Sequence, residues 1–213
     1  MVAEAWRPGA FALVRADGHQ ALADARALPA AETLQAAWQV DLSASWDQVG
    51  PITVEKLESL TAHPNPAVRH FAGTAAYRCR FQIAPERLRL ERRVWLDLGK
   101  VESVAEVIVN GKNLGTYWKP PYRVDITSVA RAGDNTLEVR VTGTWRNRLI
   151  GDAKYPGGFP EVAASGVRPF KPYLTANIGV KVDEPLAPFG LIGPVRLHSS
   201  ERVTLKFTSR STP

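Results

Sequence analysis

The chain lacks the features that mark several large protein classes. It has one cysteine, Cys79, among 213 residues, which excludes a fold held together by internal disulfides. No uninterrupted apolar run approaches the roughly 20 residues that a membrane-spanning helix needs, so a membrane is not a predicted partner. Residues 1–6 have neither the basic region nor the apolar core of a signal peptide, and none is expected. No G-x-S-x-G element indicates a serine hydrolase.

Metal and cofactor binding have equally little support. The histidines lack the spacing of zinc ligands, and we predict neither a cofactor nor a metal site. They are His19, His63, His70 and His198.

Positive charge is the compositional feature that calls for an explanation. The net charge is +6 and the pI is about 9.7, which raises nucleic acid as a partner. The basic residues are dispersed, however, and no nucleic-acid-binding motif is present. A solvated strand face explains the densest group, so nucleic acid is not a predicted partner. That group consists of Arg87, Arg89, Arg92 and Arg93.

Apolar residues recur at every second position in several short segments. Residues 94–98 and 137–141 show this alternation, which is typical of half-buried strands. Residues 107–109 lead into Asn110-Gly111, a pair that favours a two-residue hairpin turn. Strands joined by turns, with no helix between them, indicate antiparallel sheets with one buried face. The predicted fold is all-β, an antiparallel β-sandwich.

The rest of the chain adds strands at both ends of this region. Further strands are expected at 38–42, 77–81, 194–198 and 202–207. Cys79 is expected in the core, because its neighbours two residues away are apolar. Residues 9–28 predict a hairpin around Asp17-Gly18, which suggests an N-terminal unit at 1–30 and a sandwich at 31–213. Residues 52–60 fit either a helical turn or an irregular crossover.

Residues 143–188 are the main irregularity. Seven of the 16 prolines and seven of the 16 glycines lie between residues 151 and 194. A loop of this length inside a compact domain is either functional or disordered. Its aromatic residues argue against disorder, which favours an ordered loop packed on one end of the sandwich.

Four pieces of sequence resemble a known family. The order VNGKNLG, an aromatic-proline loop, VDIT and AGDNTLEVRV resembles the galactose-binding-like jelly roll of large glycoside hydrolases. HPNPAVRHFAGTAAYRCRF at 63–81, TWRNRLIGD at 144–152 and FGLIGPVRL at 189–197 are similar to the C-terminal part of glycoside hydrolase family 106, the α-L-rhamnosidases. The resemblance extends from about residue 9 to residue 197.

The resemblance implies a module of a larger bacterial enzyme. Such enzymes carry a large catalytic barrel ahead of this module, with the catalytic carboxylates in the barrel. A chain of 213 residues cannot hold both parts. The implied partner is the catalytic domain of a periplasmic or secreted parent, and residues 1–30 would be the tail of a preceding domain. A structural calcium ion is common in related sandwiches, but no loop rich in Asp and Asn marks a site for one.

A sugar site needs an aromatic ring for the apolar face of a pyranose and planar polar groups for its hydroxyls. Two segments supply both: the loop around residues 112–123 and residues 144–152. The predicted site is shallow, lies at one end of the sandwich, and accepts a rhamnose-containing or related plant glycan. Its residues are Trp118, Tyr122, Arg146, Asn147 and Asp152.

Structural interpretations stand beside these functional ones. Trp118 fits a binding and a structural role equally, and Trp95 and Trp145 fit residues that close the rim of the core. Arg148 and Asp152, four positions apart, fit a local ion pair. The module is therefore either carbohydrate-binding or purely architectural.

Independent catalysis is the third hypothesis. It would require two carboxylates about 5 to 10 Å apart across the scissile bond. The pairs in loop-like sequence are Asp152 with Glu161 and Asp183 with Glu184, and neither spacing distinguishes them from solvated acids.

Overall fold

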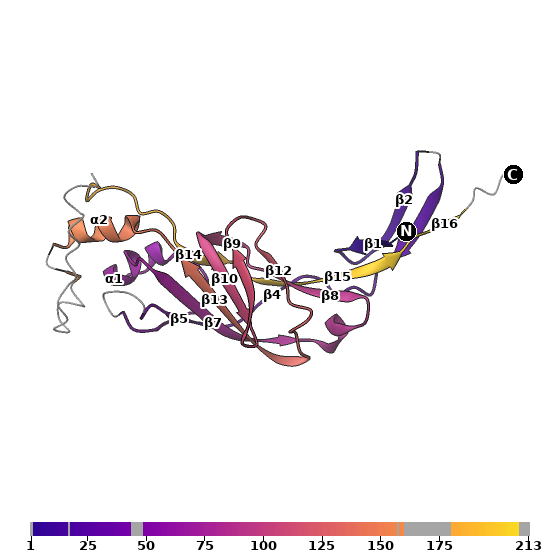
Figure 1. The fold of residues 1–213 in the computed structure, drawn as a ribbon, viewed down its shortest axis with the longest axis horizontal. Helices are drawn as coiled ribbons and strands as arrows, with labels where there is room; N and C mark the ends of the chain where they lie inside the picture. Colours follow the sequence, from indigo (N-terminus) through magenta and orange to yellow (C-terminus); the bar gives the residue numbers. More distant parts are fainter. Residues whose placement is uncertain (1, 17, 44–48, 157, 160–179, 209–213) are drawn as a thin grey trace.

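The structure is a computed structural model that describes residues 2–16, 18–43, 49–156, 158–159 and 180–208. The molecule is elongated, with a β-hairpin projecting at one end and two helices at the other (Figure 1). The middle consists of two packed antiparallel sheets. The predicted all-β sandwich is therefore confirmed.

The larger sheet has six strands in the order β11-β10-β13-β7-β5-β6, and every neighbouring pair is antiparallel. Its strands are β5 (Trp38–Asp41), β6 (Ile52–Val54), β7 (Thr74–Ile83), β10 (Val104–Val109), β11 (Lys112–Tyr117) and β13 (Gly133–Thr142).

The second sheet has the order β1-β15-β8-β12, with β4 also paired to β15. Its strands are β1 (Val2–Ala5), β4 (Glu32–Thr33), β8 (Arg92–Asp97), β12 (Arg123–Asp125) and β15 (Arg196–Thr204). Two small sheets complete the fold. They consist of β9 (Lys100–Glu102) with β14 (Gly190–Gly193), and of β2 (Ala10–Val14), β3 (Gln20–Asp24) and β16 (Lys206–Thr208).

The core lies between the two large sheets, and strand alternation fills it. In β7, Tyr77, Cys79 and Phe81 point inward, whereas Arg78 and Arg80 are exposed. Burial raises the pKa of the Cys79 thiol to about 12, so this residue is an inert core side chain as predicted.

The turn at Asn110-Gly111 has the predicted geometry. The φ angles are 50° and 79°, both in the left-handed region that a two-residue hairpin of this kind requires. Asn110 also links neighbouring segments, because its amide donates to Val129 O and to Asn135 Oδ1, each at 2.8 Å.

Replacing Gly111 with valine is expected to lower the free energy of unfolding by about 1 to 2 kcal/mol. A Cβ at this position would meet nothing within 4 Å, so the cost comes from the backbone conformation alone. Urea unfolding measures the change. An unchanged midpoint would show that the turn tolerates a branched residue.

The N-terminal hairpin is present, and it recruits the C-terminal strand. β2 pairs with β3 as predicted, and β3 also pairs with β16. This sheet packs with residues of β1 and β15 in a small apolar cluster, which is separate from the main sandwich core. The hairpin unit therefore combines segments from both parts of the chain rather than from residues 1–30 alone.

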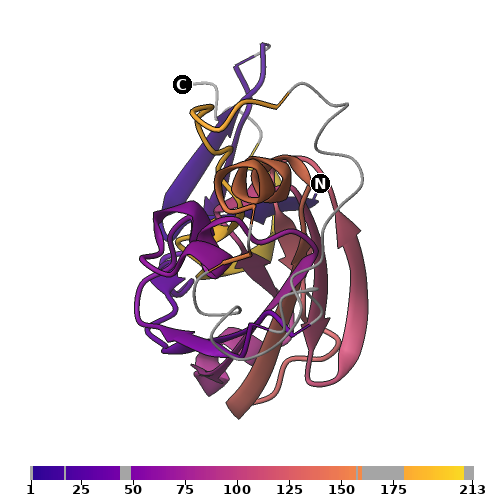
Figure 2. The same cartoon turned by 90° about the vertical axis from the view of Figure 1, so that its left-hand side faces the viewer.

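Helical structure is confined to short segments, and no helix in the described residues is long and apolar enough to cross a membrane. The helices are α1 (Pro66–Arg69), α2 (Arg146–Lys154) and the 3-10 turns η1 (Leu60–Ala62) and η2 (Pro85–Leu88). The undecided segment 52–60 begins with β6 and reaches η1. Residues 146–154 were expected in a loop. They form α2 instead, which lies at one end of the molecule and is seen end-on in Figure 2.

The burial of two arginines in the basic cluster contradicts the prediction that the cluster is a solvated strand face. Arg87 is 4% exposed and Arg92 is 7% exposed, so they do not belong to a solvated strand face. Arg87 donates to Ser199 Oγ at 3.0 Å and to Ala30 O at 2.8 Å. The two guanidinium groups are structural, which removes half of the cluster from any role in binding a polyanion.

Candidate functional site

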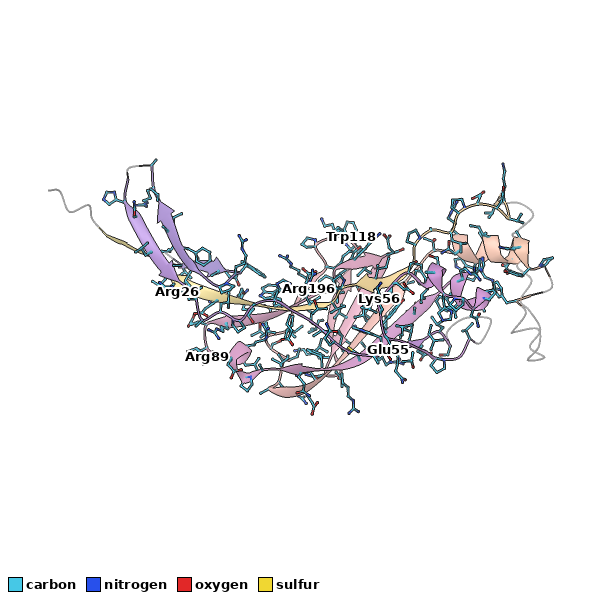
Figure 3. The ribbon with its side chains drawn as sticks, turned by 180° about the vertical axis from the view of Figure 1, so that it is seen from behind. Arg26, Glu55, Lys56, Arg89, Trp118 and Arg196 are labelled. Atoms are coloured by element: carbon cyan, nitrogen blue, oxygen red, sulfur yellow. The ribbon has the colours of Figure 1, made fainter. Side chains whose placement is uncertain are left out.

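Trp118 is the most exposed tryptophan with a described side chain. It begins the loop of residues 118–122 between β11 and β12, and 68% of its surface is accessible. Lys119 Nζ lies 5.2 Å from the centre of its ring. Figure 3 shows Trp118 over the middle of the sandwich, at the surface. The indole is therefore open to a ligand.

Tyr122 ends the same loop but has a different role. It is 8% exposed, packs into the main core, and donates its hydroxyl to Ser103 O at 3.3 Å. Its carbonyl accepts from Leu98 N at 2.9 Å. The prediction that Tyr122 presents a ring to sugar is therefore wrong. The side chain anchors the loop that carries Trp118.

The polar residues of α2 are engaged within the protein. The Asn147 amide donates to Ala187 O at 2.7 Å and accepts from Ala187 N at 2.9 Å. Arg148 Nε donates to Asp152 Oδ1 at 2.8 Å, which is the local ion pair considered from the sequence. Arg146 forms a 2.7 Å ion pair with Glu184. The contacts of Asn147 and Arg146 hold residues 184–187 against the helix, whereas the Arg148–Asp152 pair lies within it.

The five predicted residues do not form one site. Figure 3 shows Trp118 apart from α2, which carries the three polar residues at the end of the molecule. The helix is held there by aromatic packing. His70 lies 5.6 Å from Phe159 and 5.7 Å from Tyr155 between ring centres, and the Arg148 guanidinium lies 5.4 Å from the Phe159 ring. The predicted set is therefore divided between two places.

A second aromatic group lies on the outer face of the five-stranded sheet. Trp6 is 37% exposed, and its ring centre lies 4.9 Å from that of Trp95. The Arg123 guanidinium lies 5.6 Å from the Trp6 ring on the same face. Trp95 donates to Ser200 Oγ at 2.9 Å, so it is a half-buried support rather than a rim residue closing the core.

The sequence could not reveal this group, because its members come from distant strands. Arg123 begins β12, the strand that follows the Trp118 loop. Asp97 accepts from Arg123 Nε at 2.9 Å. Burial disfavours the charge on Asp97, but the hydrogen bonds from Arg123 and Gly99 outweigh it and lower its pKa. A ring with fixed planar donors and acceptors beside it suits a pyranose.

His198 stands at the edge of this group. Its Nε2 lies 4.0 Å from Asp97 Oδ2, and burial lowers its pKa below the ordinary value of 6.5. The imidazole is therefore neutral at pH 7 and adds a hydrogen-bonding group rather than a charge.

The carboxylate pairs considered for catalysis find no support. Asp152 is bound to Arg148, and Glu161 lies outside the described residues. Glu184 accepts from Arg146, and the adjacent Asp183 is an exposed loop residue. Among the residues that the structure describes, no group of three His, Cys, Asp or Glu side chains could hold a metal ion.

Comparison with known families identifies the module. Residues 64–177 match the family described as glycosyl hydrolase 2 galactose-binding domain-like. The chain belongs to this family. The matched range runs from the turn before α1 to beyond α2, so it includes the Trp118 loop and the sheet strands around it.

Two relatives show the context of such a module. A putative β-glucuronidase from Formosa agariphila is 33% identical over 205 residues, which covers 90% of this chain and 18% of that protein. The structure of a rhamnosidase from Novosphingobium sp. PP1Y is 38% identical, has a TM-score of 0.65, and matches 81% of this chain and 15% of its own.

The chain thus spans less than a fifth of the length of the relatives it matches. It is a galactose-binding-like module of the kind found in glycoside hydrolases, and catalysis by this part alone has no support.

Proposed function

We propose that the chain is a non-catalytic module that positions the glycan substrate of a rhamnosidase-type glycoside hydrolase of family 106. The ligand class is a rhamnose-containing or related plant glycan, and the partner is the catalytic domain of the parent enzyme. The 38% identity to the Novosphingobium rhamnosidase supports this choice over other members of the wider family.

The exposed ring of Trp118 carries the proposal. The indole is 68% exposed and sits on a loop anchored by buried Tyr122, so its ring face is available to stack on the apolar face of a pyranose. Arg123 lies five residues after Trp118 in the chain and contacts the Trp6 ring. This pair adds a planar polar group and an aromatic surface. The platform is open rather than concave, so we expect weak affinity, in the millimolar range.

Trp118→Ala is expected to weaken binding of a rhamnose-bearing oligosaccharide by about tenfold or more, because the stacking surface is lost. Isothermal titration calorimetry measures the change. Trp145→Ala is the matched control: it removes another indole, 47% exposed, at the start of α2. The control is expected to bind like the unaltered chain.

Two outcomes would contradict the assignment. Equal affinity of the Trp118→Ala and unaltered proteins would place the sugar elsewhere. Absence of heat at millimolar ligand, with the fold intact, would favour the alternative of a purely architectural module. The burial of Tyr122 and Asn147 is the observation that favours this alternative.

A further inference from the structure

A groove crosses the outer face of the six-stranded sheet. It has a volume of about 750 Å³, and β7 and β13 form its floor. One wall is the segment 35–37 that precedes β5, and the other is the β10–β11 turn with Ile108 and Gly111. None of its lining residues belongs to the Trp118 loop or to α2. This groove has no role in the function proposed above.

A row of ion pairs holds the charged part of the floor in place. Arg78 contacts Asp41 at 3.1 Å and Glu138 at 3.0 Å. Arg140 continues the row, with Nε 2.6 Å from Glu138 and Nη1 3.1 Å from Glu106. The row runs across β5, β7, β13 and β10, so the side chains are oriented before any ligand arrives.

Two acids of this row, Asp41 and Glu138, stay ionised. Hydrogen bonds from Ser43, followed by that from Arg78, lower the pKa of Asp41 to about 2. Burial disfavours the charge on Glu138, but the hydrogen bonds from Arg78 and Arg140 outweigh it and lower its pKa. The charge of Arg78 is thus neutralised at ordinary pH.

Other groups in the groove are uncommitted. Arg80 is exposed in the floor and, within the described residues, makes no hydrogen bond or ion pair. The side chains of Gln35, Gln39 and Thr136 line the groove without a described hydrogen-bond partner. Among the described residues, the groove therefore offers one guanidinium without an ion pair, two amides and one hydroxyl.

These polar groups indicate which class of ligand the groove binds. One unpaired cation suits one carboxylate, which a guanidinium binds in a bidentate manner. Within the described residues the other guanidinium of the groove, Arg78, is already paired with Asp41 and Glu138, so the groove offers no row of free cations to a polyanion such as nucleic acid. The amides and the hydroxyl match a ligand rich in hydroxyl groups, and Ile108 and Ala36 provide apolar contact for C–H groups.

We propose that this groove is a second carbohydrate site that binds a uronic-acid residue of a glycan chain, with Arg80 bound to its carboxylate. Gln35, Gln39 and Thr136 bind the neighbouring hydroxyls. The ligand class rests on the family to which the chain belongs, but the site is independent of Trp118.

The methyl glycoside of galacturonic acid, which carries a single carboxylate, and its methyl ester are the probes. Esterification removes the charge and leaves the sugar hydroxyls in place. Amide shifts in ¹⁵N-labelled protein report where each probe binds. We expect the acid to shift the amides of residues 78–80 and 136–138, and the ester to bind about tenfold more weakly.

Arg80→Gln is expected to reduce affinity for the acid by about tenfold or more and to abolish the preference over the ester. Arg89→Gln is the matched control, because Arg89 is an exposed arginine outside the groove (Figure 3). It removes the same net charge and is expected to leave binding unchanged. Trp118→Ala is also expected to leave it unchanged, which separates this site from the first.

Four results would overturn the proposal. The first is no binding of the acid at 10 mM (roughly the upper limit for a weak sugar site). The second is equal binding of the acid and the ester. The third is shifts that map to residues 117–123 instead of the groove. The fourth is an equal loss of affinity in Arg80→Gln and Arg89→Gln.

Discussion

Replacing Gly190 with alanine is expected to lower the free energy of unfolding by about 4 kcal/mol, the largest effect of any single change considered for this chain. Gly190 begins β14 at φ +110°, and a Cβ there would overlap the hydroxyl of Tyr77. Tyr77 is 1% exposed and sits in the main core, so it has no room to retreat. Backbone strain and overpacking therefore act together.

Gly115→Ala provides the control. Gly115 has the same φ of +110°, but a Cβ there would meet nothing within 4 Å. Its substitution is expected to cost about 1 to 2 kcal/mol from strain alone. The difference between the two variants in urea unfolding measures the overpacking against Tyr77. Equal costs would contradict the close approach of β14 to β7.

Replacing Arg92 with methionine is expected to cost about 3 kcal/mol, because it leaves buried acceptors without a donor. Arg92 Nε donates to Glu201 at 2.8 Å, and Nη2 donates to Ala27 O at 2.9 Å. Nη1 donates to Glu86 O. The side chain thus ties the segment after β3 to both β15 and η2, and holds the hairpin unit against the sandwich.

Arg93→Met is the matched control for this change. Arg93 is the next residue of β8, points to the opposite face, and is 39% exposed with Asp125 3.9 Å away. Such an exposed pair contributes little, so the control is expected to change stability by less than about 0.5 kcal/mol. Thermal and urea unfolding compare the two. Equal losses would show that the Arg92 contacts do not stabilise the fold.

Local chemistry explains what the sequence could predict. Asn110-Gly111 specifies its turn, because few other residue pairs accept positive φ at both positions. Strand alternation places Tyr77 and Cys79 inside, because the side-chain period of a strand is two. These features depend on neighbouring residues only.

Contacts between distant residues explain the features that the sequence alone could not predict. The α2 segment is helical in a region rich in Gly and Pro because Asn147 binds Ala187 and Arg148 packs on Phe159. The sequence predicts Arg87 on a solvated strand face, yet hydrogen bonds to Ser199 and Ala30 hold it inside the protein.

The candidate site shows the same limit. The sequence places Trp118 in a loop and leaves its role open, and it does not reveal the burial of Tyr122 against the core. The contact between Trp6 and Trp95 joins β8 to the residue that follows β1, and no local pattern records it. Pairings of this kind follow from strand order, which a single sequence does not specify.

The most direct test of the central claim is one titration of ¹⁵N-labelled protein with a rhamnose-bearing oligosaccharide, followed by proton spectra of the sugar in the same tube. The account predicts saturable amide shifts centred on residues 117–123 and anomeric signals of the sugar that stay unchanged for a day. New anomeric signals from a cleaved sugar would contradict a non-catalytic module, and a spectrum without shifts at millimolar sugar would contradict a binding one.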